Sequence, residues 1–167
     1  MRINEDGTDQ AIASDADILQ LQSVSPDGRW AVAGAIPQNS HGDRNVVIEA
    51  IPLQGGAPVI VCDGCSYGFG YARRSAALLS WDHAGKWMYV SLRYLPFGST
   101  KTVAIPVRPG VAPPNLMKGF STEADIGRIP GARLLNEDNV SPGPSPAYFV
   151  STKRSAKANL FRIYLEQ

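Results

Sequence analysis

Two cysteines are the residues of this chain that most readily suggest chemistry. Cys62 and Cys65 form a Cys-X-X-Cys motif, the spacing of redox-active dithiols and of half a zinc site. A structural zinc ion needs four ligands, and neither His41 nor His83 lies at a spacing that completes the set. A thioredoxin-like dithiol opens a helix, whereas this stretch has no helical period. The motif therefore favours a turn after a strand with no metal bound. A reversible disulfide, or a metal shared with residues outside the chain, is the alternative.

The serine and histidine residues do not form a catalytic pattern. His83 follows Asp82 directly in a turn, where adjacent side chains point apart, and His41 lies in a polar loop. One Gly-X-Ser-X-Gly match occurs, from Gly64 to Gly68, but the stretch has no helical period, so the strand–turn–helix context that an α/β-hydrolase nucleophile requires is missing. We therefore expect no catalytic residues, no cofactor and no enzymatic activity.

Two loops rich in aromatic and arginine side chains are the candidate binding surface. Such side chains are enriched at the hot spots of protein–protein interfaces. The candidates are Tyr67, Phe69, Tyr71, Arg73 and Arg74 in the first loop, and Tyr94 and Phe97 in the second. The alternative is that the rings fill the boundary between neighbouring structural units while the arginines are solvated. The loops favour a protein partner or self-association.

The charge balance excludes two other classes of partner. The 167 residues carry a formal net charge of only +1, so this segment has no electrostatic basis for binding nucleic acid or an anionic membrane. No apolar run approaches the roughly 20 residues that cross a bilayer. The 16 glycines and 13 prolines suit many short strands joined by tight turns.

The elements that must position these side chains repeat along the chain. Residues 2–12 align without a gap over residues 50–60, and the same outline returns at 104–110 and 162–166. A second element recurs as Val24-Ser25-Pro26, Leu79-Ser80-Trp81 and Val140-Ser141-Pro142. Compared with Asp27-Gly28, the second copy keeps an aspartate and a glycine but inserts two residues between them. Self-similarity at a period of roughly fifty residues is typical of a radial β architecture.

Each unit predicts four antiparallel strands and no helix of useful length. Alternating or β-branched runs place second strands at 30–35, 87–92 and 147–151, and third strands at 45–51, 102–105 and 159–165. The fourth strand is clearest at 58–62. The expected fold is all-β: a single domain, residues 1–167, forming a partial β-propeller of about three to three-and-a-half four-stranded blades. The expected units are a half blade at 1–13, then 21–65, 75–117 and 131–167, with 117–135 as an extended connection.

The repeated residues themselves have structural roles in this interpretation. Asp27 and Asp82 are expected to bind backbone amides in their own turns. Trp30 and Trp87 are expected to pack between neighbouring units. The full structural set is Ser25, Pro26, Asp27, Gly28, Trp30, Ser80, Trp81, Asp82, Gly85, Trp87, Ser141 and Pro142.

The run from Ser25 to Trp30, followed by an alternating strand and Gly55-Gly56, resembles the TolB-type, WD-repeat-like β-propeller repeat. That family builds each blade around a Ser-Pro-Asp-Gly turn between its first two strands. The resemblance covers nearly the whole chain and is clearest over 21–62. The stretch 129–163 is similar to the tail of propellers in bacterial sensor-like proteins, where a kinase or a winged-helix domain precedes the propeller.

This resemblance implies a non-catalytic binding or sensing module, formed by the C-terminal part of a larger bacterial protein. One alternative is the accessory propeller of a prolyl-oligopeptidase-like peptidase whose catalytic domain lies outside this chain. Another is a redox- or metal-responsive module that uses Cys62 and Cys65. Because the first and last units lack a neighbour, we expect exposed faces that favour self-association, edge to edge or face to face.

Overall fold

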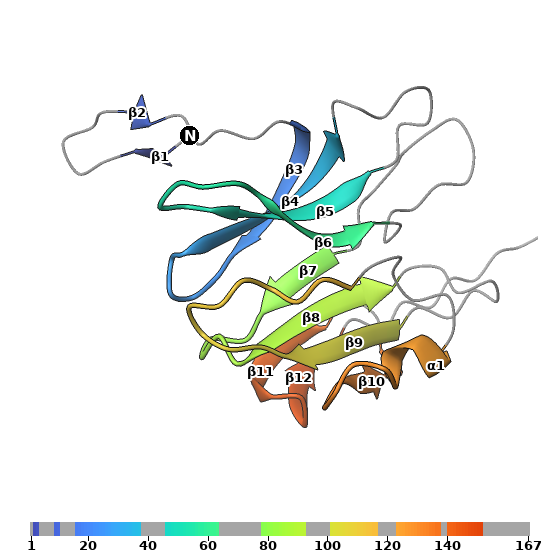
Figure 1. Ribbon diagram of the computed structural model, residues 1–167. Coiled ribbons are helices and arrows are strands. Elements are labelled where there is room, and N and C mark those ends of the chain that lie inside the picture. The colour runs from blue at the N-terminus through green and yellow to red at the C-terminus, as the bar shows by residue number, and fades with distance from the viewer. Residues whose placement is uncertain are drawn as a thin grey trace, which may run out of the picture.

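Antiparallel strands make up nearly all of the secondary structure in the described residues (Figure 1). The computed structural model describes residues 2–3, 9–10, 16–37, 46–63, 78–92, 101–116, 123–137 and 140–151. Within these ranges the chain forms strands β1 to β12 and the short helix α1 (Glu123–Ile126). The expected all-β class is confirmed. The described part of the chain holds no helix of the length and hydropathy that a membrane span requires.

The first sheet contains four strands in chain order. They are β3 (Ala16–Val24), β4 (Trp30–Pro37), β5 (Val47–Pro52) and β6 (Val59–Asp63), and each pairs antiparallel with the next. The β3–β4 turn contains Gly28 with φ +67°, a backbone conformation that residues with a Cβ rarely adopt. Strands β4, β5 and β6 lie close to the second, third and fourth strands that the sequence predicts, whereas β3 begins at Ala16, before the predicted start of the unit at residue 21.

The second sheet repeats this arrangement, with a fourth strand that comes much later in the chain. Its strands are β7 (Leu78–Trp81), β8 (Trp87–Leu92), β9 (Lys101–Pro106) and β10 (Arg133–Leu135), again paired in chain order. Residues 117–135, which the sequence predicts as an extended connection, therefore include α1 and β10. The second unit extends to Leu135, not to residue 117, because Leu134 pairs with Val103 and packs against the core.

Two shorter pairs complete the described secondary structure. Strand β11 (Ser141–Ser145) pairs with β12 (Tyr148–Val150), with a bulge between Pro142 and Ser145. Gly143 lies in this bulge, where a Cβ would overlap the carbonyl oxygen of Tyr148. Strand β1 (Arg2–Ile3) pairs with β2 (Asp9–Gln10), so the expected N-terminal half unit contains a hairpin. The strand expected at 159–165 lies outside the described residues.

Alternate residues of a strand point to opposite faces of its sheet. The core lies where the apolar faces of neighbouring sheets meet. Val32 and Ile48 of the first sheet share one buried cluster with Met88 and Val90 of the second. Side chains on the other face of the second sheet pack with the β11–β12 pair in a separate cluster. That cluster contains Tyr89, Ala104 and Val140, with Phe149 against it. The second sheet is thus buried on both faces.

The first strands of successive sheets lie next to one another. Strand β3 contacts β7, and β7 contacts β11. One bond between the first two sheets is direct: the backbone N–H of Leu79 donates to the side-chain carbonyl of Gln22 over 2.9 Å. The three sheets therefore stack in chain order with their first strands together.

Candidate functional site

The turn after β3 is closed by side chains. The Ser25 hydroxyl donates to one oxygen of Asp27 over 2.5 Å and accepts from the backbone N–H of Trp30 over 3.0 Å. The same Asp27 oxygen accepts from the N–H of Arg29 at 3.1 Å. Short polar side chains favour such turns because they replace the backbone partners that the strand ladder would supply.

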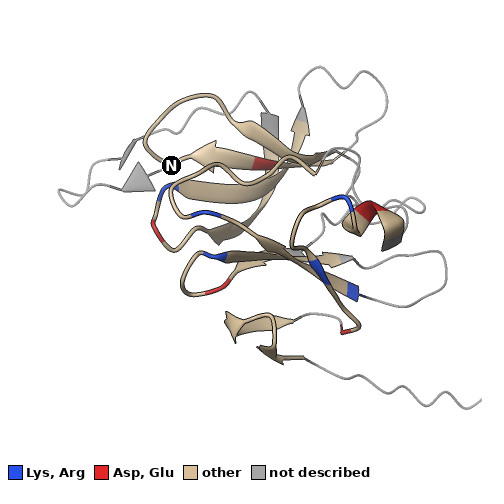
Figure 2. Cartoon of the chain, turned by 60° about the horizontal axis from the view of Figure 1, so that its bottom comes forward, with Lys and Arg blue, Asp and Glu red and all other residues tan. Residues whose placement is uncertain are grey.

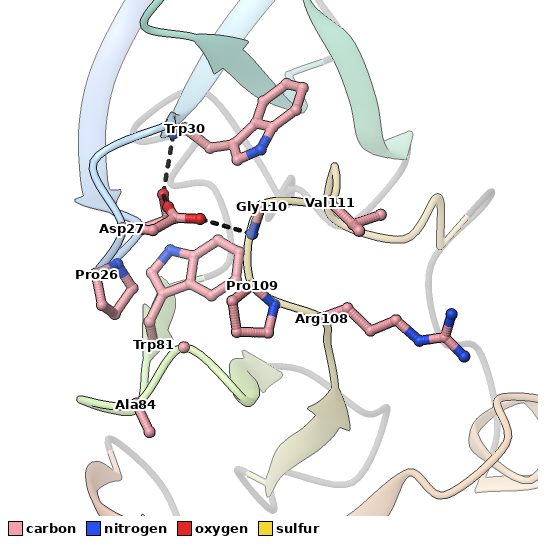
Figure 3. Close-up of a pocket in the computed structure, with 11 residues that line it drawn as sticks. Pro26, Asp27, Trp30, Trp81, Ala84, Arg108, Pro109, Gly110 and Val111 are labelled. Atoms are coloured by element: carbon pink, nitrogen blue, oxygen red, sulfur yellow. Dashed lines mark hydrogen bonds between the residues drawn. The ribbon is translucent and has the colours of Figure 1, made fainter.

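The second carboxylate oxygen of Asp27 links the two sheets. It accepts from the backbone N–H of Gly110, which follows β9 in the second sheet, over 2.6 Å (Figure 3). The hydrogen bond from the Ser25 hydroxyl is the largest of the effects that lower the pKa of the Asp27 carboxyl below its usual value. The N–H groups of Arg29 and Gly110 and the charge of Arg29 lower this pKa further. Burial acts in the opposite direction and is a smaller effect than the Ser25 hydrogen bond. All of these partners favour the ionised form. The ionised Asp27 carboxylate therefore links the two sheets through a charge-assisted hydrogen bond to the Gly110 N–H, which we call the ionic tie.

A small pocket lies beside this tie, between the two sheets (Figure 3). Its lining comes from the β3–β4 turn, the β7–β8 turn and the segment after β9. The lining residues are Ser25, Pro26, Asp27, Trp30, Trp81, Ala84, Gly85, Arg108, Pro109, Gly110 and Val111. The pocket volume is about 20 Å³, which suits about one water molecule. Small-molecule sites are typically about 300–1,000 Å³, so this pocket is a packing gap at the seam of the sheets.

The turn after β7 reproduces the first turn with different residues. One oxygen of Asp82 accepts from the N–H groups of Lys86 and Trp87, at 2.7 and 2.8 Å. The Asp82 N–H donates to the Trp87 carbonyl, and the Gly85 N–H donates to the Asp82 carbonyl. Around Ser25, the N–H of Ser25 donates to the Trp30 carbonyl, and the Gly28 N–H donates to the Ser25 carbonyl. Asp82 is therefore the structural counterpart of Ser25.

This equivalence corrects the alignment of the two turns. The sequence pairs Asp82 with Asp27 and Ser80 with Ser25, which requires an insertion of two residues. In the structure Gly85, with φ +65°, is the counterpart of Gly28, and no insertion is needed. Ser80 lies in β7, paired with Tyr89, and Ala84 occupies the place of Asp27. The positive-φ glycine and the hydrogen bonds decide the equivalence; the identity of the polar residue does not.

The third serine copy is also placed differently. Ser141 and Pro142 lie in β11, and the turn that follows contains Pro146 and Ala147. The Ser145 hydroxyl accepts from the N–H of Ala147 at a long 3.4 Å. A serine before a turn thus recurs in this unit, four residues later than the sequence suggests.

Buried polar atoms without a hydrogen-bond partner among the described residues lie near the second turn, and an oxygen of Asp82 and the hydroxyl of Tyr89 are among them. Asp82 is 1% exposed, and the oxygen that does not bind the turn has no hydrogen-bond partner among the described residues. The hydroxyl of Tyr89 is buried and unpartnered in the same part of the chain. Burial, and secondly the charge of Asp82, raise the pKa of Tyr89 above its usual value. Tyr89 is therefore a neutral phenol in the core.

The predicted binding residues Tyr67, Phe69, Tyr71, Arg73, Arg74, Tyr94 and Phe97 lie outside the described residues. Cys62 is fully buried in the cluster between the sheets and takes part in a disulfide, while Cys65 lies outside the described residues. Within the described ranges, no group of three or more His, Cys, Asp or Glu side chains is placed to hold a metal ion. In the same ranges the charged residues of both signs are spread over the two sheets and their turns (Figure 2).

Exposed apolar side chains gather at the two ends of the stack. On the first sheet these are Ile18, Leu19, Leu21 and Val24 of β3 and Ile60 of β6, with exposed fractions between 42% and 61%. On the last pair, Tyr148 and Val150 of β12 are 67% and 72% exposed. Isolated exposed apolar residues are common, but contiguous ones on a sheet mark interaction surfaces. The sequence predicts open faces on the first and last units, although not these residues.

Comparison of the chain with protein-family models, with curated proteins and with solved structures gives no significant match. The resemblance to the TolB-type repeat therefore stays a prediction from the residues.

The Asp27 tie gives a testable pH dependence. Because the folded-state pKa of Asp27 is lowered, its charge stabilises the fold above the ordinary pKa of the free carboxyl. This contribution disappears as the pH falls through the lowered value. Since Asp27 is exposed to screening solvent, we expect Asp27→Asn to lower the free energy of unfolding by only about 1 kcal/mol at pH 7. The difference from wild type should shrink below about pH 4.

Urea titrations at several pH values measure this difference. The matched control is Glu137→Gln, which changes the net charge equally at a side chain that accepts a long 3.4 Å contact from the Ser151 hydroxyl. A difference between Asp27→Asn and wild type that is independent of pH would contradict the ionic tie.

Proposed function

We propose that this chain is part of a β-propeller and serves as a non-catalytic protein-binding module. A propeller blade is a four-stranded antiparallel sheet, and successive blades pack face to face around an axis. Two features support this arrangement: two successive sheets each pair their four strands in chain order, and the first strands β3, β7 and β11 adjoin. The buried clusters between successive sheets correspond to blade-to-blade packing.

The observation that carries the binding role is the exposed apolar surface at both ends of the stack. Leu21 is 61% exposed and Tyr148 is 67% exposed, each on a strand whose opposite face is packed. Burial of an apolar face yields roughly 25 cal/mol for each Å² removed from water, so such faces favour association with protein. The pocket of about 20 Å³ at the seam of the two described sheets is too small to hold a typical small-molecule ligand.

Site-specific photo-crosslinking in the cells that naturally make the protein tests this function. A photoreactive phenylalanine analogue is placed at Leu21, at Tyr148 or at Val111, an exposed apolar residue beside the small pocket. We expect discrete protein adducts from the first two positions and none from Val111. Absence of adducts at both end positions, or equal adducts at all three, would contradict a protein-binding role for these faces.

A further inference from the structure

The exposed apolar side chains of the first sheet follow its edge strands and do not spread over its face. Leu21 shares a face of the sheet with a set of side chains on β4 and β5 that are all buried, with exposed fractions of 8% or less. These are Ala31, Ala33, Ala35, Val47, Glu49 and Ile51. On β3, in contrast, Ile18, Leu19 and Leu21 are 44%, 50% and 61% exposed. The open apolar surface is therefore a strip along the strand and not a sheet face.

Strand β3 forms one edge of the first sheet (Figure 1). Among the described residues, β4 is the only strand that pairs with it. The C-terminal half of β3 lies next to β7, where the Leu79 N–H donates to the Gln22 side chain. Residues 18–21 are all exposed, whereas Gln22 and Ser23 are half-buried. We call residues 18–21, which precede the contact with β7, the open edge.

The backbone of the open edge can accept a further strand. Backbone groups of an edge strand point alternately toward the neighbouring strand and away from it, so the open edge presents N–H and C=O groups that no described strand pairs with. An extended segment of a partner binds such groups by adding a strand to the sheet. Its side chains then lie beside the exposed apolar side chains of β3 and bury them. A bulge between Ile18 and Gln20 bends β3, so the added pairing is short and the apolar contacts matter as much as the hydrogen bonds.

The charge of the chain before the open edge favours a basic partner. Residues 1–17 contain five acidic side chains and one arginine, and Asp15 and Asp17 lie within three residues of Ile18. A strand that carries basic residues meets charge of the opposite sign there. A second copy of this chain does not. In an antiparallel pair of two β3 strands, the acidic segment of each copy lies opposite residues 22–26 of the other, which include no basic side chain. A parallel pair places the two acidic segments side by side, and like charges oppose pairing.

We propose that the open edge of β3 binds an extended, basic segment of another protein, which pairs with it as an added β-strand. The inference rests on the proposed function and states the chemistry of the partner and its mode of binding. Leu19 and Leu21 are the apolar contacts that this chain supplies, and the acidic residues before Ile18 attract the basic side chains of the segment. The buried face of the sheet takes no part, because the added strand extends the sheet sideways.

Peptide binding measured by fluorescence anisotropy tests the proposal. The probe is a labelled peptide of alternating valine and threonine with lysines at both ends, and we expect it to bind wild type saturably. The same peptide with glutamate in place of lysine should bind at least roughly tenfold more weakly at low salt. A third peptide is N-methylated at two adjacent central residues, which blocks one N–H on each of its edges. It should also bind at least roughly tenfold more weakly, because the backbone pairing is interrupted.

Variants of the chain locate the binding at the open edge. Leu19→Ser combined with Leu21→Ser removes the apolar contacts and should weaken binding of the lysine-flanked peptide at least roughly tenfold. Val111→Ser is the matched control, since Val111 is 55% exposed outside β3, and it should bind as wild type. All three side chains are exposed, so these substitutions should leave the fold intact. In wild type, the peptide should slow amide hydrogen exchange in β3 and leave exchange in β10, the edge of the second sheet, unchanged.

The proposal is overturned if the lysine-flanked peptide does not bind, or if the glutamate-flanked peptide, the N-methylated peptide or the double serine variant gives equal binding. Self-association of wild type that the double serine variant abolishes would assign the open edge to a second copy and overturn the proposal as well. The photo-crosslinking experiment separates this inference from the proposed function. Adducts at Tyr148 without adducts at Leu21 would leave the binding role intact and remove the β3 site, whereas absence of adducts at both positions would remove both.

Discussion

Replacing Ile48 with alanine is expected to lower the free energy of unfolding by about 2–5 kcal/mol. Ile48 lies in the middle of β5, is 1% exposed and belongs to the cluster that joins the first two sheets. The substitution removes apolar contacts and leaves a cavity between the two sheets. This cavity could close only if the two packed sheets moved toward each other. For a chain of this length the melting temperature should fall by about 4–20 °C.

The matched control is Ile60→Ala in the neighbouring strand of the same sheet. Ile60 is 42% exposed, so the same change of side chain should lower the free energy of unfolding by less than about 1 kcal/mol. Urea titration followed by tryptophan fluorescence measures both variants, at a protein concentration low enough to keep the chain monomeric. Similar losses for Ile48→Ala and Ile60→Ala would mean that the two sheets do not pack through the β5 face.

Strand positions could be predicted from the residues because burial of a sheet leaves a strong pattern. The run 30–33 alternates large and small apolar side chains, and 102–105 consists mainly of β-branched residues, so β4 and β9 are found close to their predicted places. Gly28 and Gly85 likewise indicate the turns between the first and second strands of the two sheets. Strand β10 cannot be predicted from the sequence, because its three partly exposed residues are too few to show a period.

The contacts between sheets could not be predicted, because they depend on how distant segments meet. The hydrogen bond from the Gly110 N–H to the Asp27 carboxylate joins residues 83 positions apart, and no pattern in either segment predicts it. The grouping of exposed apolar side chains on β3 could not be predicted for another reason. A regular strand places alternate residues on one face, whereas two bulges in β3 put Ile18, Leu21 and Val24 together.

The equivalence of Asp82 and Ser25 leads to the other large effect. Asp82→Ala should lower the free energy of unfolding by about 2–4 kcal/mol, because the N–H groups of Lys86 and Trp87 lose their acceptor in a turn where Asp82 is 1% exposed. A buried donor left without a partner costs more than the hydrogen bond itself contributes. The same aspartate-to-alanine change in an exposed turn, where no buried N–H loses its acceptor, would lower the free energy of unfolding far less.

Asp82→Ser separates the turn geometry from the identity of the side chain. If Asp82 is the counterpart of Ser25, a serine hydroxyl at this position can accept from the Trp87 N–H, as Ser25 accepts from the Trp30 N–H over 3.0 Å. Asp82→Ser should then retain roughly half or more of the stability that Asp82→Ala loses, since one of two acceptor contacts survives. It also removes the second Asp82 oxygen, which is buried without a partner among the described residues.

Urea titration of wild type, Asp82→Ala and Asp82→Ser decides between the two alignments of the turns. Under the structural alignment, serine at position 82 restores the acceptor that the first turn uses, so the variants rank wild type, Asp82→Ser, Asp82→Ala. If Asp82 were instead the counterpart of Asp27, the shorter hydroxyl would meet no equivalent partner, and Asp82→Ser would be as unstable as Asp82→Ala. Equal losses for the two variants would therefore reinstate the insertion of two residues.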